Sequence, residues 1–335
     1  MQIAEPASTL TSPRRFRARY DVTRVVDEPG DWFVSAELLV PTSVPGGDHV
    51  TVLCCTPGGG CTGEYFDLGE ADAGFSFAQY AQAAGFACVL IDNLGTGRST
   101  PGADPWISPQ NIARAGAEAF ALATHDLAAA LPATTTIATV GVGHSMGAML
   151  TLMGQAMRGQ HSAIASLGFT PSGLPNVLSP EELRVATSGP VPLEALTSIA
   201  RRIFSGAAHP GGDQRAPEPF PFNLPDTDPA GLTALGAAAT NILPLSGVLS
   251  LLPGNISEYI RQITVPVFLG GGDHEPWHRA DELVPAFESS ADITFYTLAD
   301  AAHNHNVAAT RELLWRRLLD WAAVVATAHP WPTGS

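Results

Sequence analysis

Short, continuous apolar segments recur along this chain and alternate with segments of helical character. The strongest of them are Val50–Cys55, Ala87–Ile91, Thr136–Val142, Ile164–Phe169 and Val265–Leu269, followed by a mixed strand at Ile293–Leu298. Strands that are apolar throughout are typical of a parallel sheet buried on both faces. Their alternation with helices predicts an α/β fold built on a doubly wound, mostly parallel sheet.

Helix and turn signals agree with this fold. Ser108 followed by Pro109 is typical of a helix start, and the final segment Val307–Ala326 has helical spacing of its apolar residues. Before the sheet, residues 16–27 and 32–41 are rich in strand formers and are separated by a Glu-Pro-Gly-Asp turn. They predict an antiparallel hairpin.

The alternation stops between about residues 172 and 263. A Pro- and Gly-rich part precedes a largely apolar stretch, Leu235–Leu252, which we expect to be helical but interrupted at Pro244. A structureless linker of this length is uncommon in a compact domain. We therefore expect a largely helical cap at 172–263, inserted between two core segments at 16–171 and 264–328, with tails at 1–15 and 329–335.

Composition excludes several classes of function. The net charge of −15 opposes binding to a polyanion, so no nucleic-acid partner is expected. All 17 basic residues are arginines, so the chain has no lysine to form a Schiff base, to anchor pyridoxal phosphate or to serve in a Walker motif.

No apolar run approaches the roughly 20 residues of a membrane span, and no signal-type apolar region follows Arg14–Arg19. We expect a cytoplasmic protein with reduced cysteines and no membrane partner. The sequence leaves open whether the protein forms a homo-oligomer.

The segment Thr136–Leu150 leads from an apolar strand through Gly143-His144-Ser145-Met146-Gly147 into a helix. A serine hydroxyl is a weak nucleophile, so it needs a sharp turn that presents it and a base that accepts its proton. The first N–H groups of the following helix can stabilise a developing oxyanion. The segment predicts Ser145 as a nucleophile, with a plain capping serine as the structural alternative.

This strand, Gly-x-Ser-x-Gly and helix resemble the α/β-hydrolase family, and the resemblance extends from about residue 34 to residue 326. It implies that the glycines after the strand at 50–55 form an oxyanion loop. The amide of Gly59, with Gly60 as substitute, would then act beside that of Met146. Many members carry His-Gly where this chain has Pro57-Gly58, which leaves the second donor open.

The family order of catalytic residues is serine, acid, histidine, each following a strand. The resemblance implies that Asp273, which comes first after the strand at 265–269, orients the imidazole of His303. His303 would take the proton from the serine and return it to the leaving group. Glu275 and Asp300 compete with Asp273 for the acid, and His305 competes with His303 for the base.

Two further motifs evoke other chemistry and are rejected. Gly95-Thr-Gly97 after Asp92 lacks the third glycine of a nucleotide site, so it is assigned a structural role. His274-Glu275-Pro276-Trp277-His278 matches His-Glu-x-x-His, but a zinc site of that type needs both histidines on one helical turn, which Pro276 disrupts. No cofactor and no metal are expected.

The sequence therefore predicts a serine hydrolase that cleaves a carboxylic ester or lactone through an acyl-enzyme. Several leucines and isoleucines in Ile242–Ile256 suggest a hydrophobic, uncharged small-molecule substrate, although a cap that simply packs on the core would have the same composition. A thioesterase and a hydrolase of carbon–carbon bonds share the machinery. From another class, a non-catalytic small-molecule receptor on the same scaffold is the alternative.

Overall fold

The computed structural model describes residues 14–41, 49–69, 73–101, 106–131, 135–189, 191–204 and 222–328. Within them, one eight-stranded sheet has the order β1-β2-β4-β3-β5-β6-β7-β8. Its strands are β1 (Arg14–Asp21), β2 (Phe33–Val40), β3 (His49–Thr56), β4 (Ala87–Ile91), β5 (Thr136–His144), β6 (Ala163–Leu167), β7 (Val267–Gly272) and β8 (Ile293–Leu298). Strand β1 begins at Arg14, two residues before the expected start of the core at residue 16. Residues 1–13 and the predicted C-terminal tail lie outside the described residues.

The sheet confirms the predicted fold class. Strands β1 and β2 pair antiparallel, with Arg14 opposite Val40, and β2 pairs antiparallel with β4. From β4 onward every pair is parallel. Because β3 lies between β4 and β5, the strand order reverses there, and the carboxyl ends of β3, β5, β7 and β8 open toward one edge. Ligands of open α/β sheets bind at this edge, near such a reversal.

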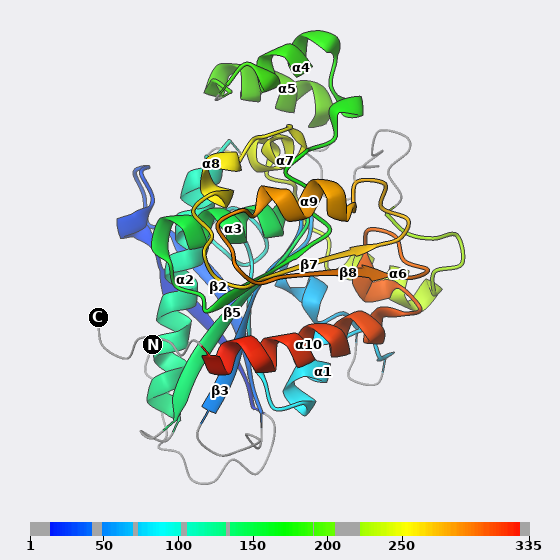
Figure 1. The fold of residues 1–335 in the computed structure, drawn as a ribbon. Helices are drawn as coiled ribbons and strands as arrows, with labels where there is room; N and C mark the ends of the chain where they lie inside the picture. Colours follow the sequence, from blue (N-terminus) through cyan, green and yellow to red (C-terminus); the bar gives the residue numbers. More distant parts are fainter. Residues whose placement is uncertain are drawn as a thin grey trace.

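Helices cover both faces of the sheet (Figure 1). On one face α2 (Pro109–Ala130) packs against α3 (Met146–Arg158), and on the other α10 (Arg311–Ala328) packs with α1 (Phe77–Ala83). Successive residues of β3 serve the two cores, since Val52 is buried with the α2 and α3 side and Leu53 with the α10 side. As predicted, Ser108 caps α2 and Pro109 is its first residue.

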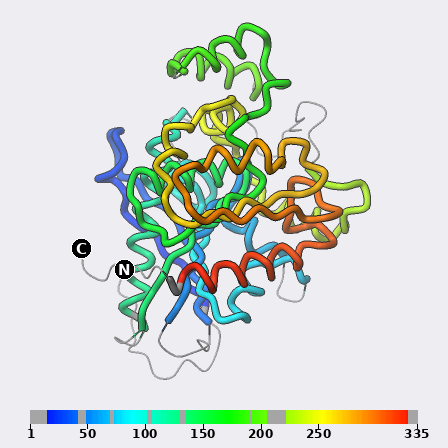
Figure 2. The backbone as a smooth tube through the Cα atoms, viewed as in Figure 1, coloured from blue at the N-terminus to red at the C-terminus, as the bar shows by residue number. Residues whose placement is uncertain are grey.

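A series of short helices lies between β6 and β7. They are η4 (Pro175–Val177), α4 (Pro180–Thr187), α5 (Leu193–Phe204), α6 (Pro229–Ala237), α7 (Pro244–Leu251) and α8 (Ser257–Ile260). Pro244 begins α7 instead of interrupting a longer helix, because proline fits the first helical turn. Helices α4 and α5 stand above the rest of the chain, as the green part of the tube shows (Figure 2). Helix α7 contacts α2, α3 and α5, whereas α6 contacts η5 (His305–Val307).

The remaining elements are η1 (Thr23–Val25), η2 (Gly63–Phe66) and α9 (Ala280–Ala286). Helix η2 follows the loop after β3, and α9 connects β7 with β8. None of the helices in the described ranges combines the length and the apolar character that crossing a bilayer requires.

Candidate active site

Ser145 stands at the turn between β5 and α3. Its backbone angles, φ 55° and ψ −126°, lie outside the regions that side-chain-bearing residues favour. Its N–H donates to the carbonyl of Leu167 at 2.8 Å, which holds the turn against β6. A non-glycine residue held in such a conformation is a mark of functional sites, because the strain persists only where the surroundings impose it.

Gly147 explains why this turn needs a small residue. A Cβ at Gly147 would lie 2.3 Å from the carbonyl oxygen of Thr56 and 2.4 Å from that of Pro57. The first turn of α3 therefore packs directly on the backbone that follows β3. This contact brings the start of α3 beside the predicted oxyanion loop.

His303 lies next to this turn, on the loop between β8 and η5. The ring of His144, which precedes Ser145, donates from Nε2 to the carbonyl oxygen of His303 at 2.8 Å. Gly168 follows the residue that holds the N–H of Ser145, and a Cβ added to it would lie 3.1 Å from Nδ1 of His303. His144 therefore connects the serine turn to the backbone of His303, and Leu167 and Gly168 lie between Ser145 and the His303 ring.

Glu275 lies beneath His303 and is 2% exposed. Its Oε1 accepts from Nδ1 of His303 at 2.6 Å, and its Oε2 accepts from Nε2 of His305 at 2.9 Å. The N–H of Gly272 donates to the same Oε2 at 2.7 Å. Burial alone would raise the pKa of this carboxyl, but attraction to His305 and hydrogen bonds from both histidines hold the pKa well below its ordinary value. The carboxylate is therefore ionised at neutral pH.

The prediction that Asp273 orients His303 is wrong. The side chain of Asp273 is 39% exposed, and its two oxygens accept from the N–H groups of Asp300 and Ala301, each at 3.0 Å. Although burial acts in the opposite direction, these two N–H groups hold the pKa of Asp273 below its ordinary value. Asp273 thus shapes the loop that carries His303, while Asp300, the other competitor, contributes its backbone at a positive φ of 51°.

The sequence favours Asp273 because it comes first after the strand, but Glu275 is the residue that reaches the histidine. A turn intervenes, in which the N–H of Glu275 donates to the carbonyl of Gly272 at 3.1 Å. A Cβ on Gly271 would lie 2.9 Å from Oε2 of Glu275 and 2.4 Å from the ring of His278. The run of glycines at the end of β7 was the available signal, because it makes room for a side chain that folds back over the strand.

The glycines after β3 lie against the serine turn. A Cβ on Gly58 would be 3.2 Å from the Cβ of Ser145, and one on Gly59 would be 3.6 Å from the sulfur of Met146. The carbonyl of Gly60 accepts from the N–H of Thr240, and its φ is 77°. Within the described part of the chain, the N–H groups of Gly59 and Met146 have no hydrogen-bond partner.

The rejected motifs have structural roles. Residues 274–278 form turns, with the His274 side chain half exposed and Nε2 of His278 donating to the carbonyl of Tyr296 at 2.9 Å. No three metal-ligating side chains converge there or elsewhere among the described residues. The carboxylate of Asp92 accepts from the N–H groups of Gly63 and Arg98, at 2.9 and 2.8 Å, and so orders the glycine turn.

Aromatic and aliphatic side chains surround His303 and the glycine loop. Phe222 and Trp277 contact the His303 ring edge to face, with centroids 5.7 and 5.9 Å away. Ile242 would contact a Cβ on Gly59 at 3.5 Å. Most leucines of the segment 242–256, such as Leu245 and Leu252, are instead buried in the core. The apolar character of these leucines therefore serves packing, whereas Ile242 lies beside the glycine loop.

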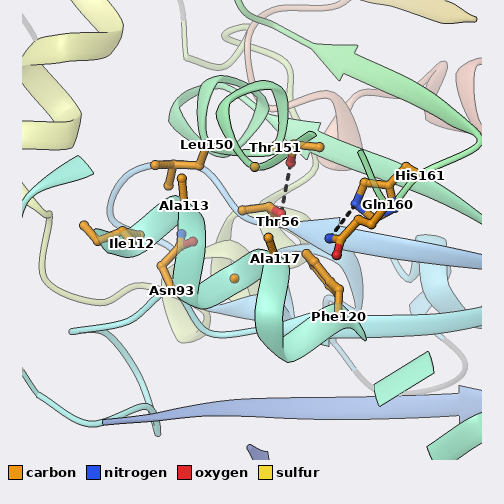
Figure 3. A pocket seen from close by; sticks show the side chains of 12 residues that line it. Thr56, Asn93, Ile112, Ala113, Ala117, Phe120, Leu150, Thr151, Gln160 and His161 are labelled. Carbon is orange, nitrogen blue, oxygen red and sulfur yellow. Dashed lines mark hydrogen bonds between the residues drawn. The ribbon is translucent and has the colours of Figure 1, made fainter. Parts of the chain in front are cut away.

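A separate small hollow lies between α2 and α3 (Figure 3). Thr56, Thr151 and His161 are among its lining residues, and the hydroxyl of Thr151 donates to that of Thr56 at 3.0 Å. None of Ser145, Glu275 and His303 lines it. The hollow is therefore distinct from the candidate active site.

The fold and this site define a class of protein. A model described as the alpha/beta hydrolase family matches residues 52–314, and the chain belongs to that family. No significant match to this sequence was found among curated proteins.

Several solved structures share the fold. The peroxisomal alpha-beta-hydrolase Lpx1 of Saccharomyces cerevisiae is 12% identical at a TM-score of 0.58, with 97% of this chain and 92% of that chain covered. A thermophilic esterase of Thermogutta terrifontis is 15% identical at 0.55, covering 93% and 99%. The enol-lactonase of Burkholderia xenovorans LB400 is 13% identical at 0.54, covering 87% and 97%.

Proposed function

We propose that this protein is a serine hydrolase that cleaves a carboxylic ester or lactone of a hydrophobic small molecule. Ser145 is the nucleophile, His303 the base and Glu275 the acid. The observation that carries the proposal is the buried hydrogen bond of 2.6 Å from His303 to Glu275, on a loop attached through His144 to the serine turn. A receptor would have no need of an ionised carboxylate buried against that imidazole.

The geometry supports an acyl-enzyme mechanism. Because Nδ1 of His303 donates to Glu275, its Nε2 carries the lone pair that can accept the proton of the Ser145 hydroxyl. The serine oxygen then attacks the substrate carbonyl, and the N–H groups of Met146 and Gly59 stabilise the oxyanion. His303 returns the proton to the leaving alkoxide, and water releases the acyl group by the same steps. Glu275 stabilises the imidazolium in both halves of the cycle.

The surroundings of the site support an uncharged substrate. Ile242 lies beside the glycine loop, and the rings of Phe222 and Trp277 flank His303. The helices between β6 and β7 supply Ile242, so we propose that they act as the cap of the pocket. Enzymes named as an esterase and an enol-lactonase share the fold, and we propose chemistry of this kind here.

The test compares purified wild type with Ser145→Ala on p-nitrophenyl esters, lactones and acyl thioesters. We expect turnover of esters or lactones that falls roughly 10⁴- to 10⁶-fold in the variant, while circular dichroism shows an intact fold. A fluorophosphonate probe should label the wild type, with the adduct mapped to Ser145 by mass spectrometry. Turnover confined to thioesters would show that the substrate is a thioester and not an ester or lactone. An adduct at another residue would refute Ser145 as the nucleophile. Tight binding without turnover would favour the receptor.

A further inference from the structure

The carboxylate of Glu275 is shared between two histidines. Each oxygen serves one ring, with Oε1 bound to His303 at 2.6 Å and Oε2 bound to His305 at 2.9 Å. All three side chains are almost fully buried. His305 takes no part in the proposed proton transfers, although it contacts the same carboxylate as His303.

The donor and acceptor pattern fixes the tautomer of both rings. An ionised carboxylate only accepts hydrogen bonds, so His303 carries its proton on Nδ1 and His305 carries its proton on Nε2. Nδ1 of His305 is buried and has no hydrogen-bond partner among the described residues. A second proton on His305 would therefore be placed in a buried position without an acceptor.

The other titratable groups facing this cluster are uncharged near neutral pH. The His144 ring lies 5.4 Å from that of His305, and burial together with repulsion from His303 and His305 holds the pKa of His144 well below its ordinary value. Burial also lowers the pKa of His278. Burial raises the pKa of Tyr65, whose ring stacks on His144, well above its ordinary value. Within the described cluster, Glu275 is thus the source of negative charge for both imidazoles.

We propose that His305 is a positioning residue that holds the Glu275 carboxylate through its Nε2–H and thereby weakens the hold of that carboxylate on the proton of His303. With the N–H of Gly272, His305 fixes the carboxylate from the side opposite His303. Each hydrogen bond donated to a carboxylate disperses its charge and reduces its attraction for a neighbouring cation. His305 thus extends activity to lower pH. This inference rests on the proposed role of His303 as the base.

The experiment measures kcat and KM against pH for wild type, His305→Gln and His305→Phe. Gln can place an amide N–H where Nε2 lies, whereas Phe keeps a ring without a donor. In His305→Phe we expect the acidic limb of the kcat/KM profile to move to higher pH by about half a unit or more, and kcat to fall about tenfold with little change in KM. His305→Gln should restore both. The matched control is His274→Gln, which removes a half-exposed histidine of the same loop and should leave the profile unchanged.

A second measurement does not depend on turnover or on a substituted chain. Nuclear magnetic resonance of wild type with 15N-labelled imidazoles should show His303 as the Nδ1–H tautomer and His305 as the Nε2–H tautomer. Observation of His305 as the Nδ1–H tautomer would overturn the inference, as would an acidic limb that does not move in a folded His305→Phe. Retained activity in Ser145→Ala would instead refute the proposed function itself, so the two failures are distinguishable.

Discussion

The imidazole of His144 donates from Nε2 to the carbonyl oxygen of His303 at 2.8 Å. The His144 ring also stacks on that of Tyr65, with centroids 4.4 Å apart, and lies tilted against that of His303, with centroids 4.7 Å apart. His144 is the residue before Ser145, so one buried side chain connects the serine turn with the histidine loop. The position of the predicted base relative to the predicted nucleophile depends on this connection.

His144→Phe tests that connection. Phenylalanine keeps the stacking on Tyr65 but loses the donor to His303, so the loop is free to shift. We expect kcat to fall about 10- to 100-fold, since a displacement of about 1 Å at a catalytic group has an effect of this size. Steady-state kinetics at the pH optimum measures it, with His144→Gln as the control that retains an N–H donor. A wild-type kcat in a folded His144→Phe would contradict the connection.

Glu275→Gln and Asp273→Asn separate the two acidic residues. Removing the charge beneath His303 should lower kcat roughly 10³- to 10⁴-fold, the effect known for the acid of such a triad. Asp273→Asn should change kcat less than tenfold and should cost about 1 kcal/mol of stability, because it weakens only the bonds to two backbone N–H groups. Kinetics and urea unfolding of both variants give the comparison. The reverse order of the two kcat values would restore Asp273 as the acid.

Ser145→Gly should be more stable than Ser145→Ala. The φ of 55° at this position is unfavourable for any residue with a Cβ and is readily adopted by glycine. We expect a difference of about 1 kcal/mol in the free energy of unfolding, and neither variant should turn over substrate. Denaturant unfolding of the two variants measures the difference without interference from activity. Equal stability would indicate that the turn is not strained.

His161→Gln should weaken the dependence of stability on pH. Burial lowers the pKa of His161 to about 3, whereas the unfolded chain takes up this proton near pH 6.5. Between these values the unfolded state binds more protons, so stability declines as the pH falls below about 6.5. The loss between pH 7.5 and pH 5 should be smaller in the variant by about 2 kcal/mol. Urea unfolding at the two pH values is the measurement, and an identical loss in both proteins would show that His161 does not contribute.

The sheet could be predicted from the sequence because its signal is local. Strands β4 and β8 have the bounds that their composition indicates, and the other parallel strands differ by a few residues at their ends. The segment from Leu235 to Leu252 was less well predicted. The structure divides it between the end of α6 and a separate helix, α7, that starts at Pro244. The predicted Pro- and Gly-rich part before it lies largely outside the described residues.

The carboxylate partner of His303 was predicted incorrectly because its position depends on a turn. Sequence order favours Asp273, but the direction of each side chain after a strand is set by the backbone of the turn. Here that turn aims Asp273 at the N–H groups of Asp300 and Ala301 and aims Glu275 at two histidines. The contact of His305 with Glu275 could not be predicted either, because only the folded loop brings the two side chains together.

Gly271 gives the site an unusual mutational sensitivity. Even the smallest side chain there would collide with the ring of His278 and lie 2.9 Å from Oε2 of Glu275. A substitution at this position would therefore alter the charge arrangement without touching Ser145, His303 or Glu275 itself. Variation at this backbone position should consequently be tolerated as poorly as variation at the reacting groups, so a survey of natural or randomised variants should find both equally depleted.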